Sequence, residues 1–175
     1  MDEVACRARS AGPGGRVVAF MSSGKPFPAR SGDRPVVSGP YPHEQVTQTA
    51  PAQWQEALIR LVGRLPGVEI GPSYVDVAGT RAFHLSPALA RGPREAFLAA
   101  TEFAHMHPSY DGSMHVALSP EDASEVEKAG WGERHPDQPL FLLYGPRNPE
   151  ECDVAWRLLQ VSYRYALGEA DPAAG

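Results

Sequence analysis

Three of the six histidines of this chain lie within residues 102–119, EFAHMHPSYDGSMHVALS. They are His105, His107 and His115. Neutral imidazole is the commonest metal ligand in proteins, and it also exchanges protons near neutral pH. Three such ligands leave coordination positions open for water or substrate. The stretch therefore predicts a site for one transition metal ion, with Fe, Zn, Cu and Ni as candidates.

The spacing places the three histidines on one face of a β-hairpin. Side chains alternate between faces along a strand, so Phe103, His105 and His107 are expected to point the same way. A turn at residues 108–112 sets His105 opposite His115. The other face would then carry the apolar pairs Ala104–Val116 and Met106–Met114, which oppose a shift of register. Glu102 falls on that apolar face, so a carboxylate ligand would have to come from elsewhere.

Two other interpretations of the histidines remain open. Without a metal, the cluster could act as general acid and base, as in a cyclase or isomerase with an apolar pocket. It could also belong to a binding module without catalytic activity, or form a structural or solvent-exposed face.

Helices and strands alternate around this hairpin. Apolar residues at helical spacing predict helices at 52–65, 120–129 and 149–167, and the last two begin with a capping residue followed by proline. Residues 73–85 predict a first hairpin turning at Ala78–Gly79, with Asp76 and Arg81 as a cross-strand ion pair. Residues 139–145 predict a central strand. The fold class expected is α+β, with a mainly antiparallel sheet, β-hairpins and helices packed on one face.

Composition divides the chain into three parts. Residues 1–45 are rich in proline and glycine and predict an extended or partly disordered arm, apart from the short apolar run RVVAFM at 16–21. Residues 46–168 predict a single domain, and residues 169–175 a flexible tail.

Charge, hydropathy and cysteine content limit the binding partners and cellular locations that the sequence predicts. The net charge is −5 and acidic residues are scattered, so nucleic acid is not expected as a partner. No apolar run is long enough to cross a membrane, and no secretory signal is recognised. Two cysteines outside any CxxC motif favour a reducing, cytoplasmic location. A homodimer is left open.

Several motifs resemble those of a known family. HMHP at 105–108, SMH at 113–115, AGWGERHP at 129–136 and YGPR at 144–147 resemble the luciferase-like domain of small bacterial and fungal proteins. The resemblance runs from about residue 65 to residue 168. It implies one compact domain, often found in bacteria rich in specialised metabolism. The chain has no flavin or nucleotide fingerprint.

The resemblance directs attention to the loop after the second predicted helix. There, His135, Glu133 and Arg134 are the predicted catalytic residues. His135 is expected to act as a fourth ligand or proton donor, Glu133 to move protons or orient a substrate carboxylate, and Arg134 to orient that carboxylate. Phe103, Tyr110 and Trp131 are the predicted contacts to substrate. The function expected is that of an enzyme acting on a small organic molecule, with the reaction class open.

Overall fold

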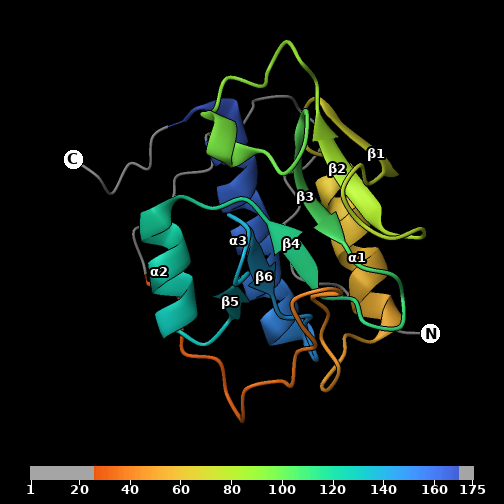
Figure 1. The fold of residues 1–175 in the computed structure, drawn as a ribbon, viewed down its shortest axis with the longest axis vertical. Helices are drawn as coiled ribbons and strands as arrows, with labels where there is room; N and C mark the ends of the chain where they lie inside the picture. The colour runs from red at the N-terminus through yellow and green to blue at the C-terminus, as the bar shows by residue number, and fades with distance from the viewer. Residues whose placement is uncertain (1–25, 170–175) are drawn as a thin grey trace, which may run out of the picture.

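The computed structural model describes residues 26–169, which form three α-helices, one short 3-10 helix and six strands (Figure 1). In chain order the elements are α1 (Ala52–Val62), β1 (Val68–Pro72), β2 (Arg81–Leu85), η1 (Arg94–Ala96), β3 (Glu102–Met106), β4 (Met114–Val116), α2 (Pro120–Lys128), β5 (Gly132–Arg134), β6 (Phe141–Leu143) and α3 (Pro149–Leu167).

The strands form one sheet in the order β1-β2-β3-β4-β6-β5. Every neighbouring pair is antiparallel. Helices α1 and α3 contact each other and cover one face of the sheet, while α2 lies beside β5 (Figure 1). The predicted α+β class with an antiparallel sheet is confirmed.

The second hairpin has the register that the hydrophobic pattern predicts. Ala104 pairs with Val116, His105 with His115 and Met106 with Met114. The methionines and Val116 lie in the core with the apolar faces of α1 and α3. Burial of these apolar side chains, worth about 1.5–3 kcal/mol each, is what holds the histidines on the opposite face.

The first hairpin exists, but its predicted register is wrong. Strand β1 begins earlier, at Val68, and residues 73–80 form a loop instead of two strand arms. The predicted ion pair between Asp76 and Arg81 is absent from the ion pairs of the described residues: Arg81 pairs with Glu56 at 2.6 Å. Val75 and Val77 are about half exposed in this loop, so their apolar side chains do not anchor residues 73–77 in the core.

The helices begin and end close to the predicted places. The side chains of Ser119 and Asn148 accept backbone N–H groups at the starts of α2 and α3, each with proline as the first helical residue. Helix α3 ends at Gly168, whose φ of 74° is the left-handed conformation that glycine adopts without strain. Helix α1 ends at Val62, three residues before the predicted end.

Strand β5 was not predicted. Its three residues include the charged Glu133 and Arg134, so no apolar alternation marks it as a strand. It forms because β6 leaves an edge free, and the ladder Gly132–Leu143 to Arg134–Phe141 pairs that edge.

The described part of the arm, residues 26–45, contains no helix and lies against the domain. The carbonyl of Pro28 accepts the Trp131 indole N–H, and Arg30 donates its backbone N–H to Ala129. The amide of Gln45 accepts the Gly145 N–H. Residues 1–25, with the run at 16–21, and residues 170–175 lie outside the described residues.

Candidate metal centre

The sheet brings three histidine nitrogens to one point. His105 on β3 and His115 on β4 are direct cross-strand neighbours, and His107 follows β3. Nδ1 of His115 lies 3.0 Å from Nε2 of His105 and 3.1 Å from Nε2 of His107. The three ligand atoms all lie within 4.8 Å of one another, and the side chains are buried. The predicted clustering is therefore present.

Two of the three rings each contact a buried carboxyl group through the nitrogen that faces away from the common point. Oε1 of Glu102 lies 2.6 Å from Nδ1 of His105, and Oδ2 of Asp111 lies 2.7 Å from Nδ1 of His107. Each carboxyl oxygen accepts the Nδ1–H of its ring. In a neutral imidazole the Nε2 atom then carries a lone pair, and this lone pair faces the common point. This carboxylate–histidine arrangement fixes ring orientation in metal sites.

The place of Glu102 was predicted wrongly. The register of β2 against β3 shifts between Phe83 and His84, so that His84 pairs with Glu102. The shift breaks the strict alternation of β3: Glu102 contacts His105, and Phe103 packs in the core against Phe83 and Tyr163. Phe103 thus does not share the histidine face. A bulge of this kind leaves no mark in a pattern of alternating residues.

Glu102 carries its charge in a closed environment. Burial raises the pKa of Glu102, but the hydrogen bonds from His105, from the Tyr74 N–H and from Ser73 outweigh burial and hold the pKa below its usual value. A charged carboxylate behind His105 strengthens the ring as an electron donor.

His115 is held neutral. Burial, followed by the charges of the neighbouring histidines, places the pKa of His115 well below its ordinary value. A metal ligand must be deprotonated, so this environment favours the form of imidazole that binds a cation.

The second ring nitrogen of His115, Nε2, contacts a histidine of the N-terminal arm. Nε2 of His115 lies 3.1 Å from Nδ1 of His43, whose Nε2 lies 3.6 Å from Oε1 of Glu133. Glu133 also accepts hydrogen bonds from Arg34 at 2.7 Å and Tyr144 at 2.5 Å. His43 had no expected role, because it stands in a segment without periodicity and only the packing of the arm brings it to the site.

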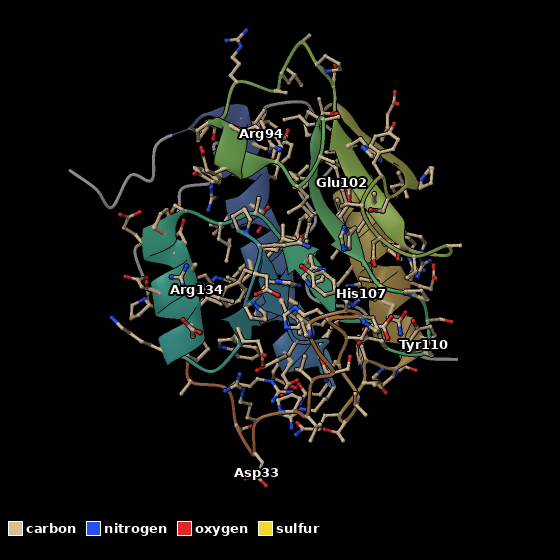
Figure 2. All side chains as sticks on the ribbon, viewed as in Figure 1. Asp33, Arg94, Glu102, His107, Tyr110 and Arg134 are labelled. Atoms are coloured by element: carbon tan, nitrogen blue, oxygen red, sulfur yellow. The ribbon has the colours of Figure 1, made fainter. Side chains whose placement is uncertain are left out.

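The predicted catalytic residues separate in space. Glu133 joins the cluster through His43, and His135 is buried with its ring 4.7 Å from the ring of His43. Both nitrogens of His135 have partners: Nε2 contacts the Pro40 carbonyl, and Nδ1 accepts two backbone N–H groups. Arg134 points the other way, toward Glu127 and Ser124 of α2, apart from His107 (Figure 2).

The aromatic residues predicted to contact substrate lie in different environments, some buried and one exposed. Trp131 lies in the core, with only its indole N–H bonded to the arm. Tyr110 in the turn is 62% exposed and donates its hydroxyl to Glu44 at 2.5 Å. Of the three predicted aromatic residues, Tyr110 alone stands where a molecule from solvent could meet it.

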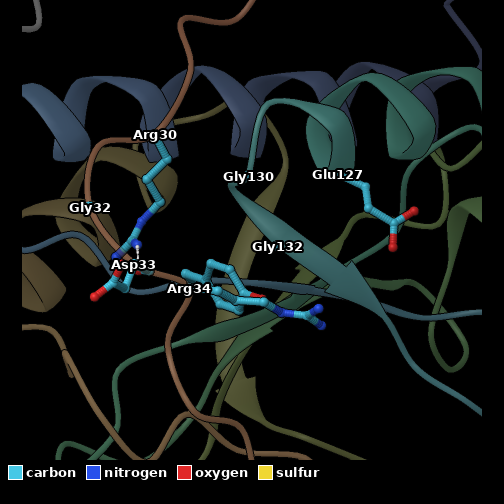
Figure 3. A pocket seen from close by; sticks show the side chains of 8 residues that line it. Arg30, Gly32, Asp33, Arg34, Glu127, Gly130 and Gly132 are labelled. Atoms are coloured by element: carbon cyan, nitrogen blue, oxygen red, sulfur yellow. Dashed lines mark hydrogen bonds between the residues drawn. The ribbon is translucent and has the colours of Figure 1, made fainter.

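A cavity of about 210 Å³ lies at the outer end of the His43–Glu133 chain. Arg30 and Arg34 of the arm and Tyr144 line it, and Figure 3 shows Glu127 on its other side. The cavity therefore adjoins the partners of Glu133 and not the converging nitrogens themselves.

Comparisons with known proteins relate the segment that carries the three histidines to a known family. Residues 100–162 match the model of the luciferase domain family. The chain is 28% identical over 169 residues to a luciferase of Neonothopanus nambi, covering 84% of this chain and 62% of the relative. It is 37% identical over 81 residues to luciferases of Armillaria gallica and Armillaria mellea, covering 41% of this chain and 30% of each relative.

The chain spans less than two thirds of these relatives. No solved structure matches it. In the described residues no helix is long and apolar enough to cross a membrane. The resemblance inferred from the motifs is confirmed: the segment that carries His105, His107 and His115 is similar to the luciferase domain family.

Proposed function

We propose that this chain is an enzyme that uses one transition metal ion, held by Nε2 of His105, Nε2 of His107 and Nδ1 of His115, to act on a small organic molecule. The observation that carries the proposal is the convergence of these three nitrogens. For metal–nitrogen bonds of about 2.1 Å, ligand atoms lie about 3.0–3.4 Å apart. Two of the three separations are 3.0 and 3.1 Å, within this range.

Hydrogen bonding alone does not satisfy this arrangement. His105 and His107 use their Nδ1–H groups on Glu102 and Asp111, so their Nε2 atoms accept. His115 can direct at most one proton to them, and one of the two acceptors is then left without a donor. A cation at the common point satisfies all three lone pairs, because buried polar groups rarely remain unpaired.

The names of the relatives favour an enzyme with a small organic substrate. A metal in this site would activate water or oxygen, or polarise a carbonyl as a Lewis acid. We assign proton transfer to Glu133 and His43, which lead from His115 toward the cavity at Arg34. His135 supports His43 by ring contact, and Arg134 takes no part.

A metal-free acid–base enzyme is the second candidate. The observation that favours it is the histidine–carboxylate pairing of His105 with Glu102 and His107 with Asp111, which also suits general acid–base catalysis. The two candidates differ in whether the cluster retains an ion.

Elemental analysis of tag-free protein tests the metal. About one equivalent of a transition metal is expected in the wild type and is expected to be lost in His105→Ala/His115→Ala. The control is His84→Ala, because His84 lies on the neighbouring strand and bonds the Pro72 carbonyl, outside the cluster. It should keep the metal. Circular dichroism establishes that both variants fold.

If the wild type retains no ion after incubation with Fe, Zn, Cu, Ni and Mn, the metal-dependent function is wrong. Metal that persists in the folded double variant would be equally contradictory, since it would lie at some other site.

A further inference from the structure

The loop between β1 and β2 brings a carboxyl group to the converging nitrogens. Oδ2 of Asp76 lies 3.3 Å from Nε2 of His105 and 3.6 Å from Nε2 of His107. Those are the two atoms that the buried carboxyl groups of Glu102 and Asp111 leave as lone pairs. Asp76 thus stands on the metal side of both rings, opposite their Nδ1 partners.

The loop itself holds this carboxyl group in place. The hydroxyl of Thr80 donates to Oδ2 of Asp76 at 2.8 Å. Thr80 is buried and directly precedes β2, so the loop closes back on its own last residue, at the point where the strand begins. Gly79 comes close to Pro108 of the histidine hairpin, where an added Cβ would lie 3.7 Å from its ring. The hydrogen bond from Thr80 therefore fixes the Asp76 carboxyl group, in a loop that runs beside the histidine hairpin.

We infer that Asp76 is the fourth protein ligand of the metal, bound through Oδ2, which makes the centre one of three histidines and one carboxylate. This inference rests on the proposed metal site. Oδ2 of Asp76 faces the Nε2 lone pairs of His105 and His107 at 3.3 and 3.6 Å, and among the described residues its hydrogen-bond donor is the Thr80 hydroxyl. Acceptor atoms therefore converge on one point, where a bound cation would satisfy all of them. A carboxylate also offsets one of the two charges of a divalent ion in a buried site.

The mixed ligand set narrows the choice of metal. Imidazole suits Fe, Zn, Cu and Ni, whereas carboxylate oxygen suits harder ions, and soft Cu(I) favours sulfur. Three nitrogens and one oxygen favour divalent Fe, Mn, Co or Zn over Cu(I). Fe and Mn also accept five or six ligands, which leaves positions for substrate beside Asp76.

Asp76 also marks the side from which substrate arrives. Its side chain is 19% exposed, against 1% for His105 and His107. The same loop carries the exposed Tyr74 and Val77, and Tyr110 is exposed on the adjoining turn. The substrate class that fits this approach is an apolar or aromatic molecule with an oxygen donor for the open metal position.

Titration with Co(II), followed by its visible absorption bands, tests the assignment. Asp76→Ala is expected to bind Co(II) at least about tenfold more weakly than the wild type and to change the band positions, because the ligand set changes. Asp76→Asn keeps an oxygen acceptor for Thr80 and should fold if Asp76→Ala does not; it should also bind more weakly. Asp33→Asn, an exposed aspartate of the arm, is the control and should match the wild type.

The outcomes separate this inference from the proposed function. If the wild type binds Co(II) and both Asp76 variants bind it with the same affinity and spectrum, Asp76 is not a ligand and the three-histidine site stands. If the wild type itself binds no Co(II), the proposed metal function fails, and the assignment of Asp76 fails with it.

Discussion

Nδ1 of His105 lies 2.6 Å from the Glu102 carboxylate, and both side chains are closed to solvent. We predict that Glu102→Gln lowers the affinity for metal about 10- to 100-fold, because the amide no longer supports the ring as a charged acceptor. Competition against a chelator of known affinity measures the change.

Glu69→Gln is the matched control for this prediction, since Glu69 is exposed on β1 and pairs across the ladder with His84. Its affinity should equal that of the wild type. Equal affinity in Glu102→Gln as well would show that the Glu102 carboxylate has no influence on the centre.

His43 should orient His115 without binding the metal. We predict that His43→Ala weakens metal binding by about tenfold but does not abolish it, because His115 Nε2 loses its 3.1 Å partner while the three ligands remain. Metal content and the Co(II) spectrum of folded protein give the readout. Complete loss of the ion would show that His43 is itself a ligand.

Glu151 at the start of α3 makes stability depend on pH. Burial raises the pKa of Glu151, but hydrogen bonds from Arg147 and the charge of Arg30 outweigh it and hold the pKa below its ordinary value of 4.5. A lowered folded-state pKa stabilises the fold fully above the unfolded-state pKa, and this contribution is lost as the pH falls through the folded-state pKa.

Glu151→Gln should therefore cost about 1.5–3 kcal/mol of unfolding free energy at pH 7, and the difference from wild type should shrink below about pH 4. Urea denaturation at several pH values measures it. Glu150→Gln is the control, because Glu150 shares the helix start but is exposed. A difference that is constant with pH would rule out the charge of Glu151 as the cause.

Gly112 ends the turn that carries Asp111, with a φ of 69°. An added Cβ would lie 2.5 Å from Nε2 of Gln55, which anchors the turn by donating to Ser109. We predict that Gly112→Ala costs about 1–3 kcal/mol and weakens metal binding, because the backbone is strained and Asp111 moves. Thermal unfolding and metal content measure the two effects.

Gly71→Ala provides the comparison, since Gly71 has ordinary φ and an added Cβ would meet His84 at 3.4 Å or more. It should change stability by less than Gly112→Ala and leave the metal in place. If Gly112→Ala is as mild as this control, the strain at the turn is not what positions Asp111.

The sequence alone determined the histidine face. Alternation along 104–107 and 113–117 leaves one register that buries Met106, Met114 and Val116, and that register pairs His105 with His115. Local signals of the same strength placed α2 and α3, where a capping side chain, proline and an apolar stripe agree. Such features depend on neighbours in the chain, so the pattern of residues is enough to find them.

Only the tertiary structure decided what surrounds the histidines. Glu102 reaches His105 through a register shift against β2, His43 comes from a segment without periodicity, and Asp76 comes from a loop. Each lies beside the cluster because separate parts of the chain pack together, and no repeat of residue types records that packing. Sequence therefore gives the converging imidazoles, while the carboxyl groups that orient and complete them depend on the fold.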